Sequence, residues 1–364
     1  MNGHRNKIGF RKKQKKNKKK AFFFLLSAIS FSFCFSGCAG TELENKYFPL
    51  ATLLEAGRQK YDVCYLSQDL SEVANERADG GNQTAEGAGG TTYYEAQKSF
   101  EKNNRCKLDL SHTKALIFQE DMIDNKEFVR FLDTVRKENT YARNTLVFLT
   151  ESSMEKLQKL NSKMDVPLGS YLEQMVGNEQ DQKERTALTL GNLLNEQANQ
   201  NRTLFLPVIK EENGQPAVTH YKVLQDFSPK GTASLEEAQI YFLLENGLKQ
   251  MDLKLDYGAQ VRLSGLKCKR KFKAQGGKVV QQVLVSADAK LVSGSALKSA
   301  VESMLQEKIL QAFWNQMEEN QADITDSYRR LAMEAPELYR EYQGHVEEYR
   351  TALECSPGVS VTMK

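Results

Sequence analysis

The sequence has few of the residues from which most enzyme active sites are built. Only four of its 364 residues are histidines, and they lie far apart at His4, His112, His220 and His345. A CxxC pair, a GxSxG nucleophile motif and a GK[ST] phosphate loop are all missing. These absences argue against metal-dependent, nucleophilic and phosphate-loop chemistry. We therefore predict a protein that is not an enzyme and has no catalytic residue, metal site or cofactor.

His112 is the histidine whose neighbours most suggest catalysis, because it lies between Ser111 and Thr113. A catalytic role would require a nucleophile–base pair in a recognisable context, and no such motif surrounds it. We interpret His112 as a residue at the start of a strand that is hydrogen-bonded to the backbone.

Long hydrophobic runs are missing after residue 40. Charged residues make up 27% of the chain, and its mean hydropathy is −0.56. A membrane-spanning helix needs about 20 predominantly apolar residues, and no second stretch of that kind follows the leader. The sequence predicts a soluble body on an anchor, long enough for two or three domains.

The first 37 residues have the pattern of a targeting segment. Ten cations lie between Arg5 and Lys20, and the uncharged, apolar stretch Ala21–Gly37 follows them. A basic region, a short apolar region and small residues before a cleavage point are typical of a secretory signal. Ser36, Gly37 and Cys38 resemble a bacterial lipobox, so we predict a signal peptide over residues 1–37 and acylation, including palmitate, at Cys38.

An uncleaved signal anchor is the alternative interpretation of this segment. Ala21–Gly37 lies at the lower limit of the roughly 17–25 residues that a spanning helix needs, and four serines dilute it. In both interpretations the basic side stays in the cytoplasm and everything after Cys38 is exported. We predict a membrane-anchored lipoprotein on the outer face of a membrane.

An excess of positive charge is missing from the exported part. The whole chain has a net charge of +3, but ten of its 50 cations precede Gly37. The remaining 40 face 47 acidic residues, which gives a net charge of −7. We identify no basic stripe in this part and predict that the protein does not bind nucleic acid.

The cysteines beyond the lipobox are widely spaced. They are Cys64, Cys106, Cys268 and Cys355. Export permits disulfides, and four cysteines allow three pairings. Isolated buried thiols are an equally good interpretation, so the disulfide state stays open.

The N-terminal region, residues 38–210, alternates between strand and helix patterns. Two β-rich runs, Ala51–Ala56 and Tyr61–Leu66, predict adjacent strands. Apolar runs that alternate with amphipathic helices then predict a βαβ-like layer containing parallel strands. The Gly-rich tract 79–90 has almost no apolar residue and is predicted to be a surface loop. The further predicted elements are helices Tyr93–Asn103, Glu127–Lys137, Ser152–Leu160, Leu168–Val176 and Arg185–Glu196, and strands Lys114–Phe118, Asn144–Leu149 and Thr203–Ile209.

The C-terminal region, residues 216–364, is predicted to be α+β. The turn cluster EENGQP at residues 211–216 is where we place a domain boundary. Two long β-rich segments, Gly258–Arg270 and Gly277–Ala287, predict an antiparallel, twisted sheet with a bulge at Gly265. Apolar residues at helical spacing predict a long helix over Ala296–Asn320, lying across this sheet. The whole chain is thus predicted to be an α+β, multi-domain lipoprotein, each domain packing helices on a mixed or antiparallel sheet.

Several short motifs are spread along the chain: Ser36-Gly37-Cys38, Glu42-Leu43-Glu44, Glu95-Ala96, Ser111 to Phe118, Arg143 to Phe148, Gln321 to Ile324, Tyr328-Arg329-Arg330 and Pro336. Together they resemble the motifs of the Ger(x)C family of spore germination lipoproteins, the C-subunits of germinant receptors. The chain lacks the family's Trp-Asp-Arg after the lipidated cysteine and its Trp near Tyr339.

The resemblance implies a non-enzymatic lipoprotein of three α/β domains at the spore inner membrane. Its partners would be a multi-pass A-subunit and a permease-like B-subunit. Within the last motif, we expect Asp323 to cap a helix with Ile324 packed behind it. Arg329 and Arg330 are candidate partner-binding residues, with a purely structural role on their helix as the alternative.

A different class of function also fits the sequence. A solute-binding or other cell-envelope lipoprotein would carry the same leader and would hold a small ligand in a cleft between its domains. The germinant, the stoichiometry of a receptor and the route of its signal cannot be derived from the sequence.

Overall fold

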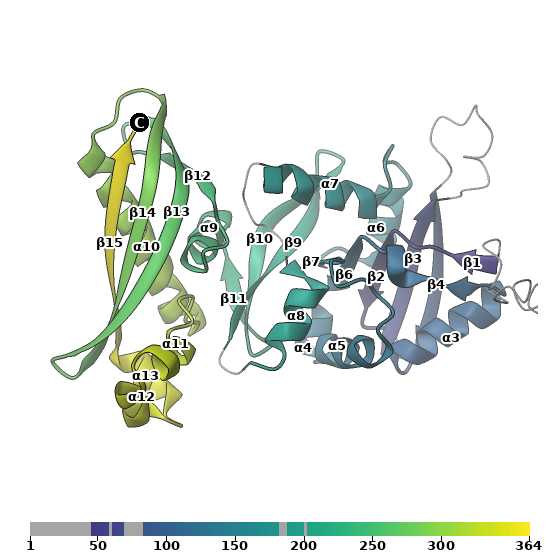
Figure 1. The fold of residues 1–364 in the computed structure, drawn as a ribbon. Coiled ribbons are helices and arrows are strands. Elements are labelled where there is room, and N and C mark those ends of the chain that lie inside the picture. The colour runs from purple at the N-terminus through teal and green to yellow at the C-terminus, as the bar shows by residue number, and fades with distance from the viewer. Residues whose placement is uncertain (1–44, 58–59, 69–82, 182–187, 200–201) are drawn as a thin grey trace, which may run out of the picture. The chain divides into compact units, whose positions relative to one another are not determined.

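The computed structural model describes residues 45–57, 60–68, 83–181, 188–199 and 202–364 (Figure 1). The chain divides into a unit of residues 1–46 and a unit of residues 47–364, and the features below belong to the second unit. The predicted signal peptide, the lipobox and Cys38 lie outside the described residues. A short strand, β1 (Lys46–Tyr47), lies at the junction of the two units.

A nine-stranded mixed sheet organises the first part of this unit (Figure 1). Its strand order is β11-β10-β9-β7-β6-β2-β3-β4, and β8 pairs with β7. The pairs β2–β6, β6–β7 and β7–β9 are parallel, as the alternation of strands and helices predicted. The strands are β2 (Ala51–Glu55), β3 (Tyr61–Gln68), β4 (Gln83–Gly90), β6 (Ala115–Gln119), β7 (Leu146–Thr150), β8 (Leu188–Thr189), β9 (Thr203–Glu212), β10 (Gln215–Gln225) and β11 (Ser228–Ala233).

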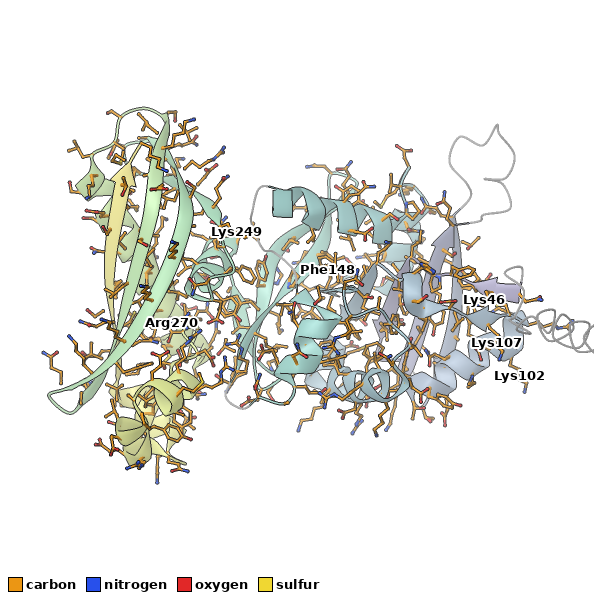
Figure 2. The ribbon with its side chains drawn as sticks, viewed as in Figure 1. Lys46, Lys102, Lys107, Phe148, Lys249 and Arg270 are labelled. Atoms are coloured by element: carbon orange, nitrogen blue, oxygen red, sulfur yellow. The ribbon has the colours of Figure 1, made fainter. Side chains whose placement is uncertain are left out.

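Helices cover both faces of the nine-stranded sheet. One apolar cluster packs α3, α4, α5 and α8 against it, and a second cluster packs α6 and α7 against the opposite face. Phe118 belongs to the first cluster. Phe148, on the adjacent strand, belongs to the second cluster (Figure 2). Adjacent strands therefore contribute side chains to both apolar layers. The helices are α3 (Tyr93–Asn104), α4 (Asp121–Asp124), α5 (Glu127–Glu138), α6 (Met154–Asn161), α7 (Leu168–Asp181) and α8 (Leu190–Glu196); β5 (Lys107–Leu108) and a 3₁₀ turn (Leu110–His112) follow α3.

Local sequence explains where these helices begin. Thr92, Ser153 and Thr189 each lie at an N-cap with extended backbone, and their hydroxyls accept hydrogen bonds from backbone N–H groups of the first turn. Such caps satisfy donors that have no partner inside the helix. The stripe of Phe128, Phe131 and Leu132 on α5 is fully buried, as its helical spacing predicted.

A four-stranded sheet organises the last part of the chain (Figure 1). Its order is β12-β13-β14-β15, with β15 parallel to β14 and the other pairs antiparallel. The predicted bulge is confirmed, because the pairing of β13 with β14 shifts between Ser264 and Lys267, and Gly265 has a φ of +61°. The elements are α9 (Leu235–Leu244), β12 (Gln250–Lys254), β13 (Gln260–Gln275), β14 (Lys278–Ser293), α10 (Lys298–Asn320), α11 (Ser327–Glu334), α12 (Pro336–Tyr342), α13 (Val346–Ala352) and β15 (Leu353–Met363).

The long helix α10 packs on one face of this sheet, as predicted. Val301, Leu305, Ile309 and Phe313 are fully buried in the same apolar cluster as the inward side chains of β13 and β14. These positions recur every four residues, so they form one stripe along the helix. The mixed sheets with packed helices confirm the coarse fold prediction.

The Gly-rich tract was predicted wrongly as a loop over the part that the structure describes. Residues 83–90 form β4, which pairs antiparallel with all eight residues of β3. Glycine fits at the end of this strand because a Cβ atom on Gly90 would lie 2.5 Å from the backbone nitrogen of Ala96. Residues 79–82 lie outside the described residues.

The predicted turn at EENGQP joins two strands of one sheet. Asn213 and Gly214 have φ angles of +53° and +80° and connect β9 to β10 as an antiparallel hairpin. Two central residues with positive φ are typical of a tight hairpin turn, and Asn-Gly is the favoured pair. The nine-stranded sheet therefore continues past the proposed domain boundary, and the division into two domains at this turn stays a prediction.

Cys64, Cys106, Cys268 and Cys355 are free thiols, and all of them except Cys106 are buried. Burial raises the pKa of the Cys64 thiol to about 11 and that of Cys355 to about 12. These thiols are protonated at neutral pH, which favours the interpretation of isolated core residues.

Candidate functional site

Arg329 and Arg330 lie on α11 and have acidic partners inside the chain. Arg329 Nε donates to Asp326 Oδ2 at 2.8 Å, and about a third of its side chain is exposed. Arg330 lies 3.8 Å from both Glu245 and Glu334. The structure thus gives both arginines a structural partner, and their role in partner binding stays a proposal.

These arginines adjoin a buried ionic network centred on Arg202. Its guanidinium contacts Asp326 at 2.7 Å and Glu245 at 3.1 Å, and a third carboxylate, Glu196, lies 3.1 Å from its Nε. Because Asp326 is nearly fully buried, these charges depend on one another for compensation. The network links the start of β9 to α9 and α11.

Arg270 on β13 extends the network towards the four-stranded sheet. Its Nη2 lies 3.1 Å from Glu245 Oε1, and its Nη1 donates to the Thr325 carbonyl at 2.8 Å. Burial would raise the pKa of Glu245, but Arg202, Arg270 and Arg330 together hold it below its usual value. Glu245 is therefore ionised at neutral pH; it accepts hydrogen bonds from Arg202 and Arg270 and forms a longer ion pair with Arg330.

Asp323 has the architectural role that was predicted, but it is not the N-cap residue. Helix α11 begins at Ser327, and Asp326 occupies the cap position. The buried Asp323 carboxylate accepts the backbone N–H groups of Thr325 at 2.9 Å and Ser327 at 2.7 Å. Ile324 is fully buried in the core beside it. Asp323 therefore orders the whole turn that precedes the helix.

His112 lies at an exposed position in the 3₁₀ turn before β6, and its ring contacts Phe48 edge-on with centroids 5.8 Å apart. It lines a cavity of about 290 Å³ together with Ser111, Lys114 and Glu173. Lys114 and Glu173 form an ion pair of 3.0 Å across this cavity. The Ser111 hydroxyl in this lining donates to Asp109 Oδ1 at 2.5 Å.

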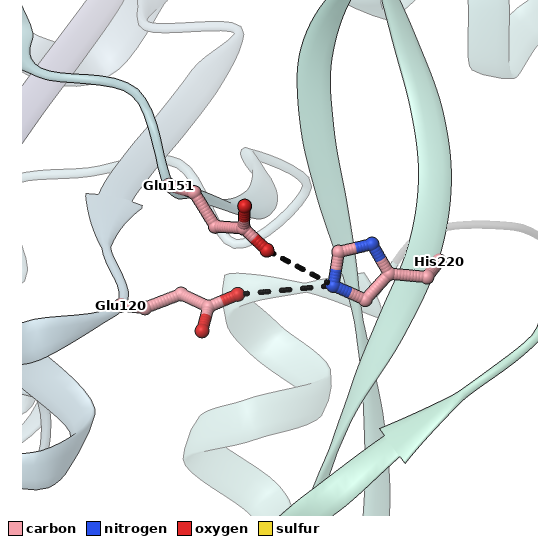
Figure 3. A group of neighbouring side chains, drawn as sticks. All are labelled: Glu120, Glu151 and His220. Atoms are coloured by element: carbon pink, nitrogen blue, oxygen red, sulfur yellow. Dashed lines mark ion pairs between the residues drawn. The ribbon is translucent and has the colours of Figure 1, made fainter.

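The structure also brings together three residues that sequence reasoning had left apart: Glu120, Glu151 and His220 (Figure 3). Glu120 follows β6 and Glu151 follows β7, at the carboxyl ends of two adjacent parallel strands. His220 lies on β10 opposite Val208, next to a register shift. Its Nε2 lies 3.5 Å from Glu151 Oε1 and 4.0 Å from Glu120 Oε1.

Two lysines complete this cluster. Lys222 Nζ lies 2.9 Å from Glu120 Oε2, and Lys210 Nζ lies 2.6 Å from Glu151 Oε2. Burial lowers the pKa of His220. The two lysines also lower this pKa, whereas the two carboxylates raise it. The Lys210 hydrogen bond lowers the pKa of Glu151. At neutral pH the cluster thus contains two anions, two cations and a neutral imidazole.

The donor atoms of Glu120, Glu151 and His220 lie within 4.8 Å of one another, a set that could hold a divalent metal. The outer oxygen of each carboxylate is already bound by a lysine, so the cluster is neutral without a metal. A divalent cation would give it an uncompensated charge of +2. This charge balance favours a structural cluster that fixes the ends of β6, β7 and β10 over a metal centre.

A sequence signal for this cluster existed. Glu120 and Glu151 each follow a short apolar run after one polar residue, at the strand ends where α/β sheets collect functional groups. His220 could not be added from the sequence, because only the long-range pairing of β9 with β7 brings β10 to this edge.

The expectation that the sequence after the leader lacks a basic stripe was wrong. The segment KCKRKFK lies on β13, where Lys267, Lys269, Lys271 and Lys273 are all exposed. Alternate residues of a strand point to the same face, so the four lysines form one row. The overall charge of −7 concealed this local excess.

None of the helices that the structure describes is both long and apolar enough to cross a membrane.

Comparison with known proteins supports a single family. Residues 40–211 match the family described as "Spore germination protein N-terminal domain". Comparison with curated proteins gives no match. Among solved structures, the chain is similar to the one titled "Crystal Structure of the GerBC protein", with a TM-score of 0.56 and 14% identity over 87% of this chain and 99% of that chain.

The first half of the chain therefore contains a spore germination N-terminal domain, and the chain as a whole shares the fold of GerBC. The chain belongs to the Ger(x)C family of spore germination proteins. This confirms the family that the short sequence motifs indicated.

Proposed function

We propose that this protein is the membrane-anchored, non-enzymatic C-subunit of a spore germinant receptor, required for nutrient-triggered germination. The observation that carries the proposal is the family match over residues 40–211. The similarity to GerBC along 99% of that chain supports the same architecture for the remainder. The predicted leader supports attachment through Cys38 to the outer face of the spore inner membrane.

We further propose that the protein acts by contact with the A- and B-subunits. Arg329 is the better of the two candidate contact residues, because about a third of its side chain is exposed and only its Nε contacts Asp326. Arg330 is more enclosed and faces Glu245. An exposed arginine is a common anchor at protein interfaces.

The test is a germination assay on spores that lack this gene and are complemented with variants. Wild type should restore the response to nutrients, and Cys38→Ala should fail to do so and should lack a fatty-acid label. Arg329→Gln leaves Arg202 beside Asp326, so the variant should stay folded and should reduce co-purification with the A- or B-subunit. Lys102→Gln, on the exposed surface of α3, is the matched control and should behave like wild type.

Normal germination of spores without the gene would refute the receptor role. Equal fatty-acid labelling of wild type and Cys38→Ala would refute the predicted lipidation site and leave the receptor role standing.

A further inference from the structure

The exposed lysine row on β13 has no counterpart in the proposed receptor function. Side chains on a strand alternate between its two faces. In the segment KCKRKFK, Cys268 and Arg270 face inward and four lysines face outward. The bulge at Gly265 sets this register, because one extra residue there reverses which side chains face outward. The row consists of Lys267, Lys269, Lys271 and Lys273.

The lysines of the row lack acidic partners. Within the described residues, none of the four lies within ion-pair distance of a carboxylate. Their cross-strand neighbours on β14 carry no charge: Ser286, Leu284, Gln282 and Val280. The next row, on β15, has one acidic residue, Glu354, which pairs with Lys278. Four positive charges therefore remain uncompensated along about 20 Å of strand.

The face that carries the row is not covered by the apolar core. Helix α10 and the apolar core lie on the inward side of β13 and β14. On the outward side the β15 neighbours are small, with Ser356, Gly358 and Ser360 opposite the β14 row. Leu284 lies between the lysines and these small residues and is 40% exposed. No side-chain wall shapes this surface into a groove for a peptide or a small ligand.

We propose that this face docks on the anionic lipid headgroups of the membrane to which the chain is attached. The proposal rests on the membrane attachment in the proposed function, and it adds an orientation of the C-terminal sheet on that membrane. A negatively charged membrane surface is complementary to a row of lysines without acidic partners on the uncovered face of a sheet. Each lysine near such a surface contributes about 1 kcal/mol, equivalent to a factor of about five in the docking equilibrium.

An acidic protein surface is the competing occupant of the row. Binding to a folded protein would be expected to require shaped contacts around the charges, and the small neighbours on β15 provide none. In the proposed function the chain is also attached to a bilayer. These two points favour the lipid surface.

The test uses the full chain reconstituted in lipid nanodiscs, alone and without other subunits. Brief acetylation with an amine-reactive reagent, read by peptide mass spectrometry, reports the accessibility of each lysine. On discs with anionic lipid, the four lysines of the row should react at least about tenfold more slowly than on zwitterionic discs. Lys102 and Lys137, exposed on α3 and α5, are internal controls and should react equally on both discs.

High salt and substitution of the lysines give two further tests of docking. At about 1 M salt the Debye length falls to about 3 Å, so the protection should disappear. The double variant Lys269→Gln plus Lys271→Gln should weaken docking about 25-fold and expose Lys267 and Lys273. The matched double variant Lys102→Gln plus Lys137→Gln should keep the wild-type protection.

Equal reaction rates on both kinds of disc would overturn the proposal. Protection that arises only after the A- or B-subunit is added would also overturn it and would assign the row to a protein contact. These outcomes are independent of the germination assay and of the lipid label on Cys38, which test the proposed function itself.

Discussion

The nine-stranded and four-stranded sheets bury their side chains in different ways. Strands β6 and β7 are buried at every position except Gln119, because helices cover both faces of the sheet. Strands β13 and β14 alternate between buried and exposed positions, because α10 covers one face only. Two-sided packing therefore appears in the sequence as a continuous apolar run, and one-sided packing appears as alternation.

The difference also decides where each sheet can expose polar side chains. A sheet with two covered faces can expose them only at its ends and edges, where the cluster of Glu120, Glu151 and His220 lies. A sheet with one open face can present a whole row, as β13 does with its lysines. The two parts of the protein are thus suited to different tasks.

Truncation of a large apolar side chain to alanine should affect the free energy of unfolding very differently in the two sheets. Phe148→Ala removes a fully buried ring from the nine-stranded sheet and should lower the free energy of unfolding by about 3–5 kcal/mol. Leu284→Ala on the open face of the other sheet should change it by no more than about 0.5 kcal/mol. Chemical denaturation of both variants measures the difference. Comparable losses would show that the face with the lysine row is covered.

Removing the central charge of the ionic network should have the next largest effect. Arg202→Met leaves the buried carboxylates of Asp326 and Glu245 without their closest cation and should cost about 3 kcal/mol. Arg262→Met removes an ion pair with Asp252 that is about half exposed, so it should cost no more than about 1 kcal/mol. Urea midpoints of the two variants give the comparison. A stable Arg202→Met protein would mean that water reaches these carboxylates.

The glycines of β4 provide a smaller and more local comparison. Gly90→Ala would place a Cβ atom 2.5 Å from the Ala96 nitrogen and should destabilise the protein by about 1–3 kcal/mol. At Gly87 the nearest atom to a new Cβ, the Val63 carbonyl oxygen, lies 3.8 Å away, so Gly87→Ala should change stability by no more than about 0.5 kcal/mol. Thermal melting of the two variants distinguishes them. Equal melting temperatures would contradict the close approach of β4 to α3.

Three of the strands that the sequence analysis missed lie at sheet edges. β4 and β11 end the nine-stranded sheet, and β12 ends the four-stranded sheet. Edge strands are held by backbone hydrogen bonds to one neighbour, so glycine-rich and polar segments such as QTAEGAGG and SPKGTA can occupy them. The two-residue strand β8 was missed for another reason, because its residues lie within the segment that was predicted as a helix over Arg185–Glu196.

The same limit applies to the sites. The capped helices, the bulge at Gly265 and the core stripe of α10 were predictable because each depends on neighbouring residues. The contacts of Arg202 with Glu245 and Asp326, and of His220 with Glu120, join residues 43 to 124 positions apart. Such contacts follow from the strand order, which no local pattern specifies. The lysine row was visible as KCKRKFK, but its single face required the register of β13.

The smallest expected effect concerns the pH dependence that His220 confers on the nine-stranded sheet. Burial lowers the pKa of His220 in the folded protein, while in the unfolded chain the pKa is about 6.5. Below that value the unfolded state binds the proton more readily, so stability should fall as the pH drops through this range. His220→Gln should lack this component between about pH 6.5 and pH 5, above the range in which most carboxylates titrate.

Glu151→Gln is the matched variant for this prediction. It removes the negative charge that opposes the lowered pKa of His220, so the loss of stability towards acid should become steeper than in wild type. Denaturant midpoints recorded at half-unit intervals of pH give all three profiles. Parallel profiles for wild type and His220→Gln would show that His220 is solvated like an exposed histidine. The cluster at the ends of β6, β7 and β10 would then be open to solvent, and the contrast between a closed nine-stranded sheet and an open four-stranded one would fail at this edge.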